Sequence, residues 1–288
     1  MRNVALVLSS GGARGLAHVG AIDELTSSGY RIRSIAGSSM GALVGGVYAT
    51  GKLKEFKEWM MSIDKRKMFS LMDLSLSISH IVKGDKVIDA LKSFVPDVNI
   101  EDLPIEYKAV ATDWENGREV VYDKGSLFEA IRASISIPLF FNPVWREDMV
   151  LVDGGIINPL PLKQGSQMSS ELLVAVNVSG SYWGGQMKLK QNIEKMKELR
   201  RSKPMSFIES LLPSGINVNY ITLMQRMSCI MMQQIAAMSI QLYKPDIVVE
   251  IPTNRFSSFD FDKFVKISNY GQLKMRKALA NYSCVSDL

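Results

Sequence analysis

The first third of the chain alternates short apolar runs with helical patterns. Residues 4–8, "VALVL", are continuously apolar and end in the loop "SSGGARG", which is typical of a buried parallel strand. A helical pattern follows over residues 16–28, and a second apolar run at 32–36 leads into a helix at 40–50. This alternation predicts a parallel sheet that is covered by helices.

Strand patterns return after a stretch of helices and loops at residues 52–103. The predicted strands lie at 107–114, 118–122, 149–153, 171–179 and 245–252, and the predicted helices at 127–133 and 261–279. No convincing linker or internal repeat divides the chain. The sequence therefore predicts one α/β domain over residues 1–288, a three-layer α/β/α arrangement with a mostly parallel central sheet.

The segment at about residues 181–244 has a different character. A helical pattern at 188–203 carries seven basic and two acidic residues, and it is either a solvated face or a patch that attracts anionic lipid. The next helix carries an apolar stripe, which consists of Tyr220, Met224, Met227, Met231, Ile235, Met238 and Leu242. Such a stripe more often packs into the core, so a homo-oligomer formed through residues 220–243 is the second interpretation.

Composition and sequence patterns limit the partners, cofactors and location that we expect for the protein. The chain has 288 residues, of which 47% are hydrophobic, and a net charge of +5, so no nucleic-acid partner is predicted. The sequence has no secretory signal pattern and no apolar run of about 18 residues. Cys229 and Cys284 form neither a disulfide framework nor a metal-ligand spacing. We expect a cytoplasmic protein, with peripheral membrane contact left open, that needs no metal or other cofactor.

The stretch "GSSMG" at residues 37–41 lies between a predicted strand and a predicted helix. It fits the G-x-S-x-G pattern of a nucleophile elbow, in which Ser39 occupies a strained turn between Gly37 and Gly41. The same pattern also occurs as a plain small-residue turn, but its position after a strand and before a helix favours a nucleophile. A serine hydroxyl becomes a good nucleophile only when a neighbouring base takes its proton.

Histidine does not fit the role of that base. The chain contains only His18 and His80. In a Ser-Asp-His hydrolase of this pattern the histidine follows the acid, whereas His80 precedes every acid that ends a predicted core strand after the elbow. His18, in "LAHVG", is interpreted as a packed or surface residue.

A carboxylate at the end of a strand is the remaining choice. Asp153 ends the run "MVLVD", and Gly154 and Gly155 follow it and let backbone and substrate come close. Asp113 also ends a strand, but it leads into the Asn116-Gly117 hairpin and is expected to be a turn residue. Asp153 is therefore the candidate base.

The loop after the first strand has two interpretations. A dinucleotide-binding fingerprint would need an acidic residue at the end of the second strand, where the sequence is "AGSSMG". An oxyanion hole fits better, because backbone N–H groups at Gly11, Gly12 and Ala13 would point to the place where negative charge develops. Arg14 would add positive potential there.

Four motifs, in this order and spacing, resemble those of the patatin-like phospholipases, in particular the bacterial and neuropathy-target-esterase-like branch. They are "SGGARGLAHVGAI", "GSSMGAL", "IRASISIP" and "VDGGIINPLP", and the resemblance covers roughly residues 4–180. It implies a patatin-like fold and a catalytic dyad of Ser39 and Asp153, with an oxyanion hole in the glycine loop that ends at Gly15. The family usually has three consecutive glycines, and here Ser10 replaces the first, which is compatible with the hole unless its φ is positive.

The sequence therefore predicts a lipid acyl hydrolase of the phospholipase A or lysophospholipase type, which cleaves carboxylic ester bonds through an acyl-enzyme. A lipid with a fatty-acyl ester is the expected substrate. The alternative is a catalytically silent lipid-binding or regulatory protein that keeps the fold.

Overall fold

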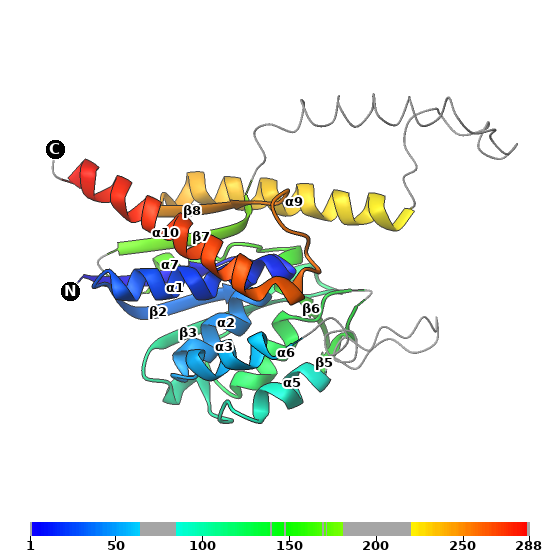
Figure 1. The fold of residues 1–288 in the computed structure, drawn as a ribbon. Helices are drawn as coiled ribbons and strands as arrows, with labels where there is room; N and C mark the ends of the chain where they lie inside the picture. Colours follow the sequence, from blue (N-terminus) through cyan, green and yellow to red (C-terminus); the bar gives the residue numbers. More distant parts are fainter. Residues whose placement is uncertain are drawn as a thin grey trace, which may run out of the picture.

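The computed structural model describes residues 2–63, residues 85–180 except 139, 147, 169 and 171, and residues 220–286. Within these residues one mixed sheet of eight strands has the order β5-β6-β3-β2-β1-β7-β8, and β4 pairs with β3 (Figure 1). The strands are β1 (Asn3–Leu8), β2 (Arg31–Ser38), β3 (Glu106–Asp113), β4 (Arg118–Tyr122), β5 (Val144–Arg146), β6 (Met149–Asp153), β7 (Leu172–Gly180) and β8 (Ile247–Pro252). The basic segment at 188–203 and His80 lie outside the described residues.

The direction of the strands confirms the predicted sheet. Strands β3, β2, β1, β7 and β8 run parallel to one another, whereas β4 and β6 run antiparallel to β3, and β5 runs antiparallel to β6. In this register Ser38 pairs with Val110 of β3, and Asp153 pairs with the next residue, Ala111. The end of β2 and the end of β6 are therefore brought together beside one short part of β3.

Helices cover both faces of the sheet. They are α1 (Ala17–Ser27), α2 (Met40–Ala49), α3 (Leu53–Met61), α5 (Asp85–Lys92), α6 (Leu127–Ser134), α7 (Leu162–Ser166), α9 (Tyr220–Tyr243) and α10 (Phe264–Ser286), with 3₁₀ turns η1 (Gly12–Leu16), η2 (Ile100–Asp102), η3 (Gly154–Ile156) and η5 (Phe261–Lys263). Alternate side chains of β1 face opposite layers, as the period of a strand requires. Leu6 and Leu8 belong to the cluster that includes α1, α2 and α10, and Ala5 and Val7 to the cluster that includes α7 and α9.

Helix α9 forms where the sequence predicts it, but its apolar stripe does not pack into the core. Met227, Met231, Met238 and Leu242 are exposed, and the helix instead contacts the sheet layer through Ala236, Ile240 and Tyr243. The interpretation of the stripe as core is therefore wrong, because the face of α9 that meets the sheet carries Ala236, Ile240 and Tyr243 instead. Self-association through residues 220–243 stays a prediction. Among the described helices, neither α9 nor any other is long and apolar enough to span a membrane.

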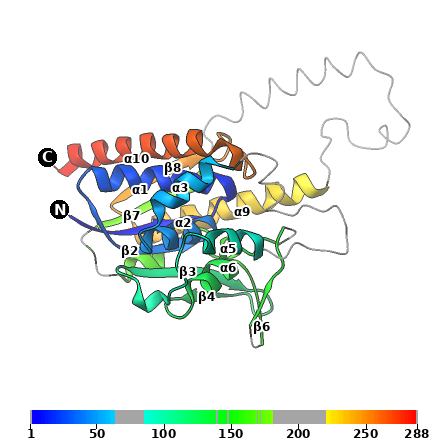
Figure 2. The same cartoon turned by 60° about the horizontal axis from the view of Figure 1, so that its bottom comes forward.

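Helices α1 and α10 lie side by side, as Figure 1 and Figure 2 both show. A Cβ atom added at Gly20 of α1 would collide with the backbone carbonyl of Ser268 in α10. The guanidinium of Arg276 donates two hydrogen bonds to the carboxylate of Glu24, at 2.7 and 2.8 Å. Because α1 directly follows the glycine loop, this packing holds the loop against the end of the sheet.

The close approach of the two helices predicts that Gly20→Ala lowers the free energy of unfolding by about 2 kcal/mol, since backbone atoms must move to admit the methyl group. Gly46→Ala in α2 is the matched control. Its Cβ would meet side-chain ends rather than backbone, those of Ile131, Leu127 and Tyr107 at 3.0, 3.1 and 3.3 Å. Urea unfolding of both variants measures the difference, and equal losses of stability would contradict this account of the α1–α10 contact.

Candidate active site

Ser39 occupies the turn between β2 and α2. Its backbone has φ 53° and ψ −122°, a conformation that is rare for a residue with a side chain and is typical of a nucleophile elbow. The turn can be this sharp because Gly41 has no side chain. A Cβ atom there would collide with the backbone carbonyl of Leu8. Only 2% of Ser39 is exposed. The predicted strand, turn and helix are therefore all present around this serine.

The hydroxyl of Ser39 donates a hydrogen bond of 2.5 Å to Oδ2 of Asp153, the last residue of β6. The other carboxylate oxygen, Oδ1, accepts the N–H of Gly155 at 2.7 Å. The backbone of Asp153 is fixed as well, because its N–H donates to the carbonyl of Ser136 and its carbonyl accepts the hydroxyl of Thr112. The structure thus joins the two residues that the sequence singled out as nucleophile and base.

The carboxyl group of Asp153 is buried, and this burial sets its acidity. Loss of hydration raises the pKa of Asp153 to about 7, against the opposing effect of the hydrogen bonds from Ser39 and Gly155. A carboxyl group with this pKa is far more basic than one in water. It therefore matches the requirement for a general base that works near neutral pH.

The glycine loop presents two uncommitted amides at the start of η1. The N–H of Ser10 donates to the carbonyl of Pro159, and the N–H of Ala13 donates to the carbonyl of Ser258, at 2.8 and 2.9 Å. Within the described part of the chain, no acceptor is bonded to the amides of Gly11 and Gly12. Gly12 has φ +59°, which explains the need for glycine at that position. The loop therefore offers the amides of Gly11 and Gly12, and the amide of Ala13 is already used.

Arg14 and Ser10 have structural roles in this loop. The Nε of Arg14 donates to the carbonyl of Val178 at 3.0 Å, and its Nη1 donates to the hydroxyl of Ser258 at 2.8 Å. Burial lowers the pKa of the Arg14 guanidinium. Ser10 does not have a positive φ, so the replacement of the first glycine causes no backbone strain there.

The other glycines predicted to support the site lie at close approaches. A Cβ atom would meet the Met40 side chain at Gly15, the backbone of Ala42 at Gly37, the carbonyl of Val110 at Gly154, and the hydroxyl of Ser10 at Gly155. The contact between Gly155 and Ser10 brings the loop after Asp153 against the glycine loop. The residues predicted from three separate motifs thus meet at one end of the sheet.

His18 is fully buried and bonded to the backbone of the glycine loop. Its Nε2 lies 2.8 Å from the carbonyl oxygen of Ser9, which can only accept, so Nε2 carries the proton. Burial lowers the pKa of His18 to about 4. The imidazole is therefore neutral at physiological pH. His18 is a packed residue, as the sequence indicated.

Asp113 also behaves as the sequence predicts. Its carboxylate accepts hydrogen bonds from the Asn116 side chain and from Arg118, and these bonds close the turn between β3 and β4. Across the described residues, no group of three or more His, Cys, Asp and Glu side chains is placed to hold a metal ion.

Sequence reasoning missed two serines that contact the site. Ser134, at the end of α6, accepts the backbone N–H of Ser39 at 2.9 Å. Ser258, in the loop before α10, bonds to both Ala13 and Arg14. Ser134 lies within the quoted motif "IRASISIP", so the motif was a signal for it. Ser258 carries no local signal, because only the folded chain places it beside the glycine loop.

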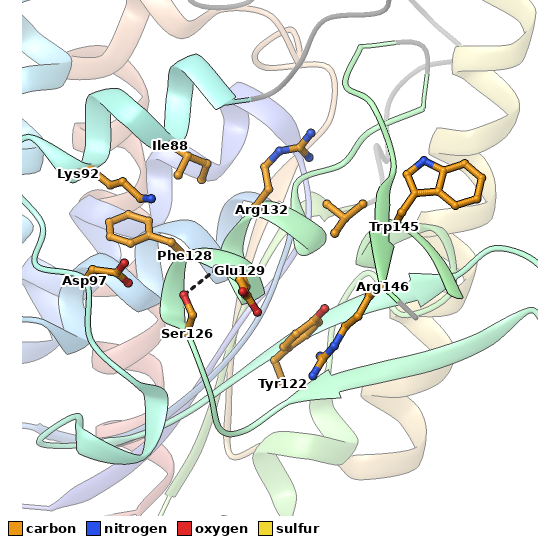
Figure 3. Close-up of a pocket in the computed structure, with 11 residues that line it drawn as sticks. Ile88, Lys92, Asp97, Tyr122, Ser126, Phe128, Glu129, Arg132, Trp145 and Arg146 are labelled. Atoms are coloured by element: carbon orange, nitrogen blue, oxygen red, sulfur yellow. Dashed lines mark hydrogen bonds between the residues drawn. The ribbon is translucent and has the colours of Figure 1, made fainter. Parts of the chain in front are cut away.

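A separate pocket of about 380 Å³ lies beside α6 (Figure 3). Lys92 lies over the ring of Phe128 and Arg146 over the ring of Tyr122, at 5.4 and 5.3 Å from the ring centres. The pocket is lined by Ile88, Lys92, Asp97, Tyr122, Ser126, Phe128, Glu129, Arg132, Val144, Trp145 and Arg146. Neither Ser39 nor Asp153 lines it, so the pocket is distinct from the candidate active site.

The chain belongs to the patatin-like phospholipase family, because the model of that family matches residues 6–165. An uncharacterized NTE family protein of Mycobacterium tuberculosis is 48% identical over 181 residues, which cover 63% of this chain and 50% of that protein. Patatin-like phospholipase domain-containing protein 7 of Mus musculus is 32% identical over 185 residues, which cover 61% of this chain and 13% of that protein.

Among solved structures, VipD from Legionella pneumophila aligns with a TM-score of 0.47 and 15% identity, over 98% of this chain and 67% of that one. The chain spans about half the length of the mycobacterial relatives that it matches.

The burial of His18 predicts a pH effect on stability. The pKa of His18 is about 4 in the folded chain and about 6.5 when unfolded, so the unfolded state binds the proton more tightly between these values. The contribution of His18 to stability should therefore fall by roughly 2 kcal/mol between pH 7 and pH 5. Protonation of Asp153 acts in the opposite direction, and it does so equally in the parent protein and in a His18 variant. In His18→Gln this part of the loss should disappear. Urea unfolding of both proteins at the two pH values measures it, and the same pH dependence in both would contradict the buried neutral histidine.

Proposed function

We propose that the protein hydrolyses carboxylic ester bonds in lipids, with Ser39 as nucleophile and Asp153 as general base. The observation that carries the proposal is the hydrogen bond of 2.5 Å from the Ser39 hydroxyl to the Asp153 carboxylate inside a buried site. Membership of the patatin-like phospholipase family supports lipids as the substrate class.

In the first half of the reaction, Oγ of Ser39 attacks the acyl carbonyl carbon while its proton passes to Oδ2 of Asp153. The carbonyl oxygen becomes an oxyanion, and the amides of Gly11 and Gly12 donate hydrogen bonds to it. When the tetrahedral intermediate collapses, the carbon–oxygen bond to the alcohol breaks. Asp153 returns the proton to the leaving alcohol oxygen. An acyl-enzyme on Ser39 remains.

In the second half, a water molecule takes the place of the serine hydroxyl. Asp153 accepts a proton from this water as the water oxygen attacks the acyl carbon. The same two amides stabilise the second oxyanion, and collapse returns the proton to Oγ of Ser39. The fatty acid leaves and the resting hydrogen bond between Ser39 and Asp153 forms again. One carboxyl group therefore performs the proton transfers that a histidine performs in a triad.

Removal of either dyad residue is expected to abolish ester hydrolysis. Ser39→Ala and Asp153→Asn should each lower kcat for a short chromogenic ester by ~10³-fold or more, because nucleophile and base act as a unit. Ser34→Ala is the matched control. Ser34 lies in β2, the strand that leads to Ser39, and its buried hydroxyl has no hydrogen-bond partner within the described residues. Full activity in either dyad variant would refute the assignment, and an inactive parent protein would favour a silent lipid-binding protein.

The raised pKa of Asp153 predicts the pH dependence of the reaction. The base must be ionised to accept a proton, so kcat/KM for an uncharged ester should fall about tenfold per pH unit below an inflection near 7. The carboxyl group is uncharged below that pH, where it can no longer act as the base. Initial rates between pH 5 and 9, with circular dichroism to verify the fold, provide the profile. An inflection near pH 4 would show that Asp153 is hydrated in the working enzyme and would contradict the role of burial.

A further inference from the structure

Ser134 connects the candidate nucleophile to the centre of the sheet. It is the last residue of α6 and is fully buried. Its hydroxyl donates to the carbonyl of Val110 in β3 at 2.6 Å and accepts the backbone N–H of Ser39 at 2.9 Å. The side chain thus uses both its donor and an acceptor site, and both partners are backbone groups.

The direction of these two hydrogen bonds is fixed by their chemistry. The carbonyl of Val110 can only accept, so the Ser134 proton points to it and a lone pair remains for Ser39. The N–H of Ser39 precedes helix α2, where the first amides have no acceptor within the helix. Ser134 supplies that acceptor from another element.

The same carbonyl lies beside the loop that follows the base. A Cβ atom at Gly154 would collide with the carbonyl oxygen of Val110, so this loop packs directly on the group that Ser134 binds. Ser134 therefore contacts the elbow on one side and, through Val110, the residue after Asp153 on the other.

We infer that Ser134 is a positioning residue, which holds the backbone of Ser39 at its positive φ so that the serine hydroxyl faces Asp153. The inference rests on the proposed hydrolase function. Ser134 acts through Ser39 and contacts no reacting atom. Without its hydroxyl, the N–H of Ser39 loses its acceptor and the strained turn loses a restraint.

Ser134→Ala tests the inference by a split between kcat and KM. With a short chromogenic ester, kcat should fall about 10- to 100-fold, since small displacements of a nucleophile have effects of this size. KM should change by less than about twofold, because binding of the ester does not involve Ser134. Rates are normalised by titration with a serine-reactive phosphonate, so that unfolded molecules are not counted.

Ser126→Ala is the matched control for a general effect on α6. The Ser126 hydroxyl accepts the N–H of Glu129 at 3.3 Å, at the opposite end of the same helix. Its loss should lower stability to a degree comparable with Ser134→Ala, by removing a helix cap, while kcat per active site stays at the parent value. Equal kcat in the two variants would overturn the inference.

Ser134→Cys keeps the test decisive if Ser134→Ala does not fold. A thiol has nearly the same shape but is a weak acceptor, so kcat should fall to a value between those of the parent and Ser134→Ala. Parent-level kcat in Ser134→Cys would overturn the positioning role. Failure of the parent protein to hydrolyse the ester would instead refute the proposed function, so the two failures are distinguishable.

Discussion

The backbone of Ser39 adopts a conformation that costs ~1–3 kcal/mol, and its neighbours are arranged to hold it there. The small residues on either side let the turn pass directly over the end of β1. The hydroxyl of Ser134 accepts the amide of Ser39, and the carboxylate of Asp153 accepts its side chain. Three strands and two helices therefore meet at one residue. The strain places the hydroxyl at the end of the sheet, where α/β folds bind ligands.

A buried carboxylate beside a serine has two consequences that follow from one cause. Removal of water from Asp153 raises its pKa, which makes it a stronger base, and it also makes the charged form of the folded protein less stable. The hydrogen bonds from Ser39 and Gly155 limit this cost without removing it. An aspartate exposed to water would lower the stability of the folded protein less, but it would be too weak a base at neutral pH. At this one side chain, burial thus lowers the stability of the folded protein and raises the basicity of the carboxylate.

Much of the fold and of the candidate site was predictable because the signals are local. Apolar runs predicted the central strands, the small residues around Ser39 predicted the elbow, and Asp153 was the strand-end acid left after the turn role of Asp113 was recognised. Long-range partners gave no such signal. The carbonyl of Ser258 removes the Ala13 amide from the expected set of donors. The outward stripe of α9 was missed for a related reason, since helical periodicity does not show which face meets the sheet.

The contact between Arg14 and Ser258 joins residues 244 positions apart, and it has a consequence for the order in which the protein is made. A growing chain releases the glycine loop from the ribosome before β7, and β7 before Ser258. Until Ser258 has been made, the elbow serine therefore lies beside a loop that lacks its fixing partners. Long-range contacts of this kind form slowly. A nascent chain consequently holds the nucleophile in an incomplete site, and competence for the proposed chemistry arrives only when β8, Ser258 and α10 have docked.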